Sequence, residues 1–413
     1  MKTILFFYAG FHDKVGLPSY NPFEYRFLEV LCKKYRVVVV VFTRGGQRKL
    51  TEKIAPANVE FAFIDDFPLY TRLPPIVAWP LRTITHILQV ALLIRSVRPD
   101  LVDSNWVTRS AGFYCAVVNH HPLLTTAWGS DILIEAKKSF ILRAFARFTL
   151  RVTDGVIVDS EIQQKAVLER GCSPSKIHSF PWGIDLDKFK PRKDDTIRSE
   201  LGWSGDERII ISTRMHSPTY GIEYLIRAMP LILDEVNNAR FLVIGAGPLI
   251  QYHKDLAKEL GVSNQVKFLG LVSNDVMPKI LNSADLYVST SFSDGTSASL
   301  LEAMACGLPI VATKIPANEE WIVQGQNGFL VPAGDSLELA KCVMSILRDD
   351  QLRSRMSSQN LRTAAERADW KKNSLVFEKC VSDLLNSGQR HCAEGEQFTT
   401  RDRKPMDLHS INR

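Results

Sequence analysis

The chain has 413 residues, of which 45% are hydrophobic and 23% are charged, and its formal net charge is +6. This length exceeds what one ordinary hydrophobic core supports, so we expect two soluble domains. A mild positive charge without an RNA- or DNA-binding motif does not indicate a nucleic-acid partner. The seven cysteines form no C-x-x-C pair and no zinc-like spacing with histidine, which predicts a cytoplasmic protein without a structural metal site.

Strand-like and helical segments alternate along the first half of the chain. We expect buried strands at 4–8, 36–42, 59–64, 99–103, 123–127 and 156–158, and helices at 24–34 and 84–94. The run 36–42 contains five consecutive β-branched valines, which is typical of a parallel strand covered on both faces. Repeated β-then-α units predict a parallel sheet with helices on both faces.

The apolar stretch 76–97 has the length of a membrane span. It contains Pro80, Arg82, His86, Gln89 and Arg95, and polar side chains of this kind are costly inside a bilayer. We therefore expect a core helix packed on a sheet rather than a transmembrane helix.

A change of composition marks the boundary between the two halves. Segment 181–191 combines two prolines and a glycine with alternating charges, as connections do. A second α/β series follows it. We expect an N-terminal domain at 1–183, a C-terminal domain at 184–370, a helix at 371–386 that returns to the N-terminal domain, and a disordered tail at 387–413.

The stretch 291–313 carries the strongest chemical signal. It continues from a strand through a Gly/Ser/Thr turn into a helix and then into another strand. Two carboxylates, Asp294 and Glu302, flank small residues that leave backbone N–H groups uncovered where the helix begins. Such a helix start binds anions, phosphate above all. The stretch is therefore a candidate site for a phosphate and a hydroxyl-rich group.

Other polar residues follow neighbouring strands of the second series. Arg214 comes directly after one expected strand, and Gly245 and Gly247 come after the next. Ligands of open α/β sheets bind beyond the carboxyl ends of the strands, so these residues and Asp294 together suit a nucleotide diphosphate that carries hydroxyl groups. Because the glycine pair lacks the third glycine of a dinucleotide fingerprint, we expect no nicotinamide or other cofactor. Taken alone, Arg214 could equally form a surface ion pair.

In this order, the motifs resemble the retaining glycosyltransferases of family 4. The resemblance implies an α/β fold of the GT-B type, with two Rossmann-like domains and a cleft between them. The matching segments are the linker 183–189, Arg214 with Gly221, 245–248, 268–272, 284–288, the E-x7-E-like pair at 294 and 302, the run LEAMACGLP at 301–309, 320–322, 327–331 and, more weakly, 128–132.

The resemblance also implies roles for individual residues. Glu302 would bind the ribose hydroxyls of the donor, and Asp294 would lie near the hydroxyls of the transferred sugar. Arg214 would neutralise the diphosphate as it leaves, so that no metal ion is needed. Backbone N–H groups for the diphosphate would come from Gly295, Thr296, Ser297, Ala298 and Ser299.

Further positions complete the implied site. The base would contact the backbone around Val272, and Gly247 and Tyr220 would line the donor side. On the acceptor side, the resemblance implies weaker assignments for Trp128 and Asp131.

Several positions depart from the family pattern. Asp294 replaces the usual glutamate and is one methylene shorter, Tyr220 replaces the usual lysine before Gly221, and Trp128 replaces a histidine. The paired glycines of the first loop are also missing, with Gly16 the nearest equivalent. Because the other motifs keep their order, we expect a subgroup with altered donor contacts.

Residues 137–151 carry five basic residues and no acidic one, interleaved with Phe, Ile and Leu. A basic amphipathic helix of this kind can lie on an anionic membrane surface, which would place the protein at the inner face of the plasma membrane. An ordinary covering helix with a solvated basic face has the same pattern, so both interpretations stay open.

These observations predict a metal-independent, hexosyltransferase-type glycosyltransferase. It would move a sugar with retention from a nucleoside-diphosphate sugar to a hydroxyl of a glycan or lipid-linked intermediate in surface polysaccharide or glycoconjugate synthesis. Two alternatives remain open at this stage. A GT-B sugar-nucleotide epimerase would need additional acid and base residues, which the sequence does not identify. A non-catalytic scaffold that binds a nucleotide sugar would explain the departures at 220 and 294.

Overall fold

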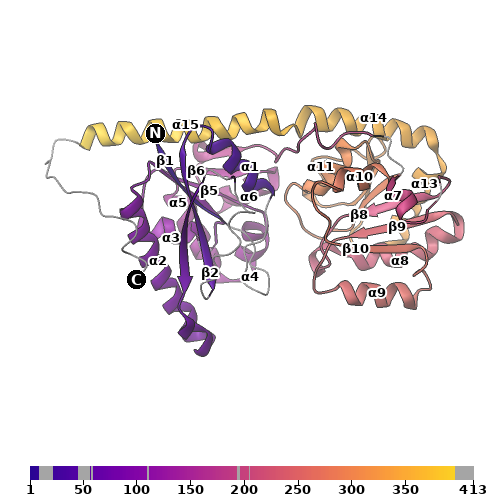
Figure 1. The fold of residues 1–413 in the computed structure, drawn as a ribbon, viewed down its shortest axis with the longest axis horizontal. Helices are drawn as coiled ribbons and strands as arrows, with labels where there is room; N and C mark the ends of the chain where they lie inside the picture. The colour runs from indigo at the N-terminus through magenta and orange to yellow at the C-terminus, as the bar shows by residue number, and fades with distance from the viewer. Residues whose placement is uncertain are drawn as a thin grey trace. The chain divides into compact units, whose positions relative to one another are not determined.

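A computed structural model describes residues 1–8, 22–44, 56, 59–108, 111–192, 196–203 and 205–395 of the chain. They form two compact units (Figure 1). Unit 1 comprises Met1–Asp159, Gln163–Phe180 and the chain from Ser374 onward, and unit 2 comprises Ser160–Ile162 and Pro181–Asn373. The chain therefore passes between the units close to the boundary expected at 183 and 184, and again near the start of the last helix.

Unit 1 is built on a seven-stranded parallel sheet in the order β3-β2-β1-β4-β5-β6-β7. The five consecutive valines of β2 are all buried, as expected for a strand covered on both faces. The strands are β1 (Thr3–Phe7), β2 (Arg36–Arg44), β3 (Glu60–Asp66), β4 (Leu101–Asn105), β5 (Leu123–Thr126), β6 (Gly155–Val158) and β7 (Ile177–Ser179).

Helices α2, α3 and α5 lie on one face of this sheet, where residues of α2 and α3 share a core with β1, β2 and β4. The helix α15 also contributes to unit 1, and Phe377 from it stacks on Phe27 of α1 with ring centroids 4.3 Å apart. The helical segments are α1 (Pro22–Leu31), η2 (Pro68–Arg72), α2 (Pro75–Val97), α3 (Ala111–Val118), η3 (Ser130–Glu135), α4 (Ala136–Lys138), α5 (Phe140–Val152), α6 (Glu161–Glu169), η4 (Pro174–Lys176) and α15 (Trp370–Gly395).

Unit 2 has a six-stranded parallel sheet in the order β10-β9-β8-β11-β12-β13. Two large apolar clusters fill the space on its two faces, because alternate residues of each strand point to opposite sides. The strands are β8 (Arg208–Ser212), β9 (Ala239–Ile244), β10 (Val266–Gly270), β11 (Leu286–Ser289), β12 (Ile310–Thr313) and β13 (Gly328–Val331).

The helices of unit 2 alternate with its strands, as right-handed β-α-β crossovers require. They are α7 (Thr196–Glu200), η5 (Pro218–Tyr220), α8 (Ile222–Glu235), α9 (Ile250–Glu259), α10 (Met277–Asn282), α11 (Ala298–Ala305), α12 (Pro316–Glu319), α13 (Ser336–Arg348) and α14 (Asp350–Arg367).

Two sequence-based boundaries are wrong. The last helix does not stop at 386 but continues to Gly395, because no helix-breaking proline interrupts this polar stretch. The basic segment 137–151 is not one helix: Ser139 adopts an extended conformation and caps α5 by accepting a hydrogen bond from the Leu142 amide. The first loop with Gly16 and the tail beyond 395 lie outside the described residues.

The prediction of a core helix at 76–97 also needs correction. It packs on the sheet as α2, but its buried side chains are restricted to Ala78, His86, Val90 and Ile94. Leucine and isoleucine side chains on its outer face are exposed to solvent. By length and composition α2 is also the one helix among the described residues that could cross a membrane. The apolar composition of the segment therefore does not reveal where its side chains point.

Asp103 lies in β4, the central strand of the unit 1 sheet, and is 1% exposed. Neither of its carboxyl oxygens has a hydrogen-bond partner among the residues that the structure describes. Burial raises the pKa of Asp103 to about 8, whereas in the unfolded chain this group ionises near pH 3.8. The folded state therefore holds one more proton than the unfolded state between these values, and the free energy of unfolding falls as the pH rises through that window.

We expect Asp103→Asn to remove this pH dependence, because the amide is nearly isosteric with the protonated acid and does not ionise. The variant should gain up to about 1.4 kcal/mol relative to the natural chain for each pH unit between about 4 and 8. Urea unfolding at pH 5, 6, 7 and 8 measures this difference. Parallel stability curves for the two proteins would contradict the assignment.

Candidate functional site

The candidate donor site lies where the strand order of unit 2 reverses. From β8 the sheet extends through β9 to β10 on one side, and it resumes at β11 on the other side. Arg214 follows β8 and Asp294 follows β11, so the two residues leave adjacent parallel strands at the same edge. Ligands of doubly wound sheets bind at this reversal point. The fold thus brings together two residues that are 80 positions apart in sequence.

The Arg214 guanidinium is the centre of this site. It forms an ion pair through Nη2 with the Asp294 carboxylate. Its Nη1 atom donates to the Ser297 hydroxyl at 2.7 Å and to the Ser299 hydroxyl at 2.9 Å. Arg214 is 8% exposed, so these contacts replace most of the water that a guanidinium would otherwise bind. The arginine is therefore held in a fixed position before any ligand arrives.

Ser297 also determines where α11 begins. Its side chain caps the helix and accepts from the Leu300 amide at 3.4 Å. The turn that precedes it, which contains Gly295 and Thr296, is buried. Glu302 is half-buried one turn further along α11. The predicted N–H groups, Arg214 and Asp294 therefore gather at one helix N-terminus, where the helix dipole favours an anion.

Two tyrosines complete the surroundings of Arg214. The guanidinium carbon lies 4.3 Å from the centroid of the Tyr220 ring, which is a cation–π contact. Tyr287 donates to the Ser299 hydroxyl at 2.9 Å. Burial raises the pKa of Tyr220, so its phenol stays neutral. At position 220, where the family pattern has a second cation, this chain has a tyrosine whose ring lies against the Arg214 guanidinium.

Asp294 experiences two opposing effects. Burial raises the pKa of its carboxyl, whereas Arg214 and hydrogen bonds from Gly295 and Ser297 lower it, and the net direction is upward. Desolvation is thus the larger influence. A ligand that takes over the Arg214 contacts would leave this carboxyl without its main counter-ion.

Gly245 and Gly247 have positive φ angles of 137° and 156° and lie against the backbone after β8. A Cβ atom at Gly245 would come within 2.3 Å of the Arg214 carbonyl oxygen, and one at Gly247 within 2.4 Å of the His216 carbonyl oxygen. The turn is fixed to the same segment by the His216 amide, which donates to Ala246 at 3.0 Å. The glycines are therefore required for this close approach. Val272, half-buried after β10, lies on the next loop along the sheet edge.

A buried histidine pair supports this turn. The Nδ1 atoms of His216 and His253 are 2.7 Å apart, and His253 lies 3.5 Å from the Glu223 carboxylate. Both imidazoles are fully buried. Burial lowers the pKa of His216 to about 4 and also lowers that of His253. One Nδ1 must donate and the other accept, so the contact is lost when both Nδ1 atoms carry a proton.

Trp128 and Asp131 form a separate group in unit 1. The Asp131 carboxylate accepts from the amides of Val107 at 2.9 Å, Trp128 at 3.1 Å and Ile132 at 2.8 Å. Burial raises the pKa of Asp131 to about 6. Trp128 donates through Nε1 to Asn105 at 3.1 Å. These contacts show that Asp131 holds the loops after β4 and β5 in place.

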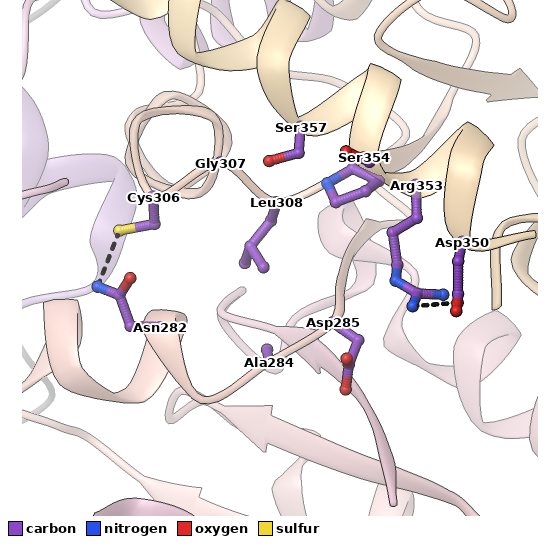
Figure 2. Close-up of a pocket in the computed structure, with 11 residues that line it drawn as sticks. Asn282, Ala284, Asp285, Cys306, Gly307, Leu308, Asp350, Arg353, Ser354 and Ser357 are labelled. Carbon is purple, nitrogen blue, oxygen red and sulfur yellow. Dashed lines mark hydrogen bonds and ion pairs between the residues drawn. The ribbon is translucent and has the colours of Figure 1, made fainter. Parts of the chain in front are cut away.

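A surface cavity of about 310 Å³ opens elsewhere on unit 2 (Figure 2). It is lined by residues that precede β11 and β12, including Asp285 and Leu308, and by α14. In Figure 2, Arg353 pairs with Asp350, and Asn282 contacts the Cys306 sulfur. Because these strands are parallel, the cavity lies at their amino ends, opposite the edge that carries Arg214 and Asp294. It is therefore not part of the candidate donor site.

Two family models match this chain. The model described as "Glycosyl transferases group 1" covers residues 193–363, and that described as "Glycosyltransferase Family 4" covers residues 25–188. The chain belongs to the group 1, family 4 glycosyltransferases. The family suspected from the sequence motifs is thereby confirmed.

Individual relatives agree with this assignment. An uncharacterized glycosyltransferase of Methanocaldococcus jannaschii is 34% identical over 190 residues, which are 46% of this chain and 48% of that protein. The N-acetyl-alpha-D-glucosaminyl L-malate synthase of Bacillus anthracis is 27% identical over 263 residues, or 64% of this chain and 68% of the relative. The matches thus span about half to two thirds of the lengths of these curated relatives.

The fold has a close counterpart among solved structures. HepE of Anabaena, in complex with UDP, matches with a TM-score of 0.74 and 23% sequence identity, over 93% of this chain and 100% of HepE. The two parallel-sheet units and this likeness confirm the predicted GT-B fold.

Several residues in or beside the candidate donor site were not predicted from the sequence. Tyr287 lies within a buried strand, and its pattern does not differ from that of a core aromatic residue. His216 and His253 are 37 positions apart, and nothing in their spacing indicates a pair. His216 alone carried a usable signal, because it follows Arg214 by two residues beyond the end of β8.

The histidine pair predicts acid sensitivity. An unfolded imidazole takes up its proton near pH 6.5 and His216 only at about 4, so the unfolded state binds more protons between these values. The free energy of unfolding should therefore fall as the pH drops through this window, by up to about 1.4 kcal/mol per unit. We expect His216→Asn, which can keep the contact to His253 Nδ1, to flatten this fall. Thermal unfolding between pH 4 and 7 measures this pH dependence. Equal slopes of the free energy of unfolding against pH in both proteins would show that the histidine pair does not cause the fall.

Proposed function

We propose that this protein is a retaining glycosyltransferase that uses a nucleoside-diphosphate sugar as donor. The observation that carries the proposal is the Arg214 guanidinium, which is fixed by Asp294, Ser297 and Ser299 at the N-terminus of α11. A fixed positive group beside the backbone N–H groups of a helix start suits a diphosphate whose negative charge grows as it departs. Family membership supports transfer of a sugar rather than of a phosphoryl group.

The proposed reaction needs little from the protein except leaving-group stabilisation. The bond from the anomeric carbon to the diphosphate oxygen breaks, and both electrons leave with the diphosphate. The acceptor oxygen then bonds to the anomeric carbon on the same face of the sugar, and its proton passes to the departing phosphate. Arg214 and the N–H groups from Gly295 to Ser299 would stabilise the negative charge on that phosphate. Asp294 would orient the sugar hydroxyls.

The remaining residues would select the donor. Glu302 would accept hydrogen bonds from the two ribose hydroxyls, and the backbone around Val272 would contact the base. Gly247 would let the diphosphate approach the backbone closely. Tyr220 would hold Arg214 through its ring face rather than contribute a charge.

We further propose a hexose as the transferred sugar and a glycan or lipid-linked hydroxyl compound as the acceptor. The names of relatives favour this class: they include a phosphatidyl-myo-inositol mannosyltransferase of Mycobacterium leprae, 27% identical over 212 residues. Trp128 and Asp131 would then contribute to the acceptor side, Asp131 by holding the Trp128 backbone in position.

Substitutions at two positions separate binding from turnover. Glu302→Ala should weaken UDP or GDP binding at least tenfold, measured by calorimetry, because two hydroxyl contacts are lost. Arg214→Lys should lower the turnover number about 10²- to 10³-fold, because a single ammonium cannot reproduce the guanidinium contacts. Glu319→Ala, at an exposed glutamate of α12, is the matched control and should change neither quantity.

The product identifies the reaction class. Release of free nucleoside diphosphate from a panel of nucleotide sugars supports a transferase. Interconversion of the sugar without nucleotide release would indicate an epimerase. Binding without turnover in the presence of lipid acceptors would indicate a scaffold. Full activity of both site variants would refute the residue assignments.

The proposal also predicts activity without a divalent cation. Arg214 and the N-terminus of α11 would supply the positive field that Mg²⁺ or Mn²⁺ supplies in other transferases. Nucleotide release should therefore stay within twofold after treatment with EDTA. A loss of more than tenfold that added Mg²⁺ or Mn²⁺ restores would show that a metal ion takes part.

A further inference from the structure

The outer face of α2 is apolar from Val77 to Leu92. Val77, Leu81, Ile84, Leu88 and Leu92 are 44%, 42%, 55%, 58% and 64% exposed. They recur every three or four residues, which places all five on one side of the helix. A helix that packs on a sheet normally turns its polar side outward. A continuous exposed apolar stripe of this kind indicates a contact surface.

The inner face of α2 shows that the helix belongs to the folded unit and does not cross a bilayer. Val90 and Ile94 are part of the core shared with β1, β2 and β4. Near its middle, Arg82 forms an ion pair with Asp66 of β3 at 3.1 Å, and His86 Nε2 lies 3.0 Å from the same carboxyl oxygen. Removing α2 from the sheet would break these contacts. A membrane could therefore meet this helix only along its outer face.

The neighbouring helix α5 carries the positive charge. Arg143, Arg147 and Arg151 recur every four residues and are exposed. Phe140 and Phe148 on the same helix are 80% and 42% exposed. Arg147 and Arg151 form no ion pair with any residue that the structure describes. Neither α2 nor α5 contains an acidic residue.

Stacked aromatic rings join these helices into one surface. Trp79 of α2 stacks on Phe145 of α5 with centroids 5.9 Å apart, and Phe145 stacks on Phe113 of α3 at 3.8 Å. All three helices lie on the same face of the unit 1 sheet (Figure 1). We call the five apolar residues of α2, the two exposed phenylalanines and the three arginines of α5 the apolar–basic surface.

We propose that the apolar–basic surface docks this protein on an anionic lipid bilayer, with α2 lying in the plane of the membrane interface. The aliphatic stripe would enter the boundary between headgroups and acyl chains, and the arginines would bind lipid phosphates. The proposal rests on residues far in sequence from the donor site, so it can fail or succeed independently of the transfer reaction.

The charge pattern favours a membrane over a second copy of the chain. In a twofold symmetric dimer through this surface, each helix would meet the same surface of its partner. The arginines of both copies would then face a surface without acidic residues, and like charges would repel. An anionic headgroup layer complements both the charge and the apolar stripe.

Flotation of the full-length protein with vesicles tests the proposal. We expect at least tenfold more protein to float with vesicles of phosphatidylcholine and phosphatidylglycerol in a 70:30 ratio than with pure phosphatidylcholine. Raising NaCl from 50 to 500 mM should reduce binding severalfold, because surface charges are screened. Binding that is equal on both lipid compositions would overturn the electrostatic part of the proposal.

Two pairs of substitutions test the two parts of the surface. Leu88→Glu with Leu92→Glu should lower vesicle binding at least tenfold, and Arg147→Gln with Arg151→Gln should lower it on anionic vesicles only. Leu168→Glu, at a leucine of α6 that is 37% exposed, is the matched control and should bind as the natural chain does. Circular dichroism verifies folding. If the variant with Leu88→Glu and Leu92→Glu does not fold, the variant with Arg147→Gln and Arg151→Gln decides the outcome. Unchanged binding of that variant to anionic vesicles refutes the proposal.

Two further measurements fix the orientation and exclude the alternative. Quenching of tryptophan fluorescence by brominated lipids should rise in Leu88→Trp, because position 88 lies in the middle of the exposed stripe. Light scattering of the protein without lipid should give a monomer mass. A dimer that the Leu88→Glu, Leu92→Glu pair dissociates would show that a second copy covers the surface. Nucleotide release from donor sugar in lipid-free buffer should be the same in all these variants.

Discussion

The burial of the Arg214 guanidinium is the constraint on which the candidate donor site depends. A cation that is 8% exposed must find its hydrogen bonds within the protein, and here it uses Asp294 and Ser297 from the loop after β11 and Ser299 from the first turn of α11. These contacts join the ends of β8 and β11, the two strands beside the reversal in strand order. One of these residues, Ser297, also caps α11, so the position of the arginine and the start of the helix are fixed together.

Much of the fold could be predicted because it follows from local patterns. The valines of β2 predicted a doubly covered strand, and the succession of strands and helices predicted two parallel sheets. Arg214 and Asp294 could be placed at one sheet edge because carboxyl ends of parallel strands coincide. Their direct contact could not be predicted, since the order of strands within a sheet depends on pairings between distant segments. For the same reason, the contacts of Tyr287 and of the His216–His253 pair could not be predicted, because they depend on how side chains of different elements point toward one another.

The helix α2 shows a different limit of prediction from sequence. Its composition does not distinguish a core helix from a surface helix, because both can contain the same apolar side chains. The four buried positions, Ala78, His86, Val90 and Ile94, include a histidine, whereas the exposed stripe consists of valine, leucine and isoleucine. The contact of His86 with Asp66 explains this reversal, because it gives the buried imidazole a polar partner on the sheet. From side-chain polarity alone, one would predict that the stripe of valine, leucine and isoleucine is the buried face of the helix.

Two departures from the family pattern meet at the same guanidinium. The aspartate at 294 pairs with Arg214, and the tyrosine at 220 lies under it at 4.3 Å. A lysine at 220 would put a second positive charge beside a buried arginine, which a single carboxylate could not balance. A tyrosine removes that repulsion and still attracts the cation through its ring. With one cation and one carboxylate, the site is close to neutral before a diphosphate arrives. Changing Tyr220 to the lysine of the family pattern would therefore disturb this charge balance, whereas changing Asp294 to glutamate would keep the charge and only lengthen the side chain by one methylene.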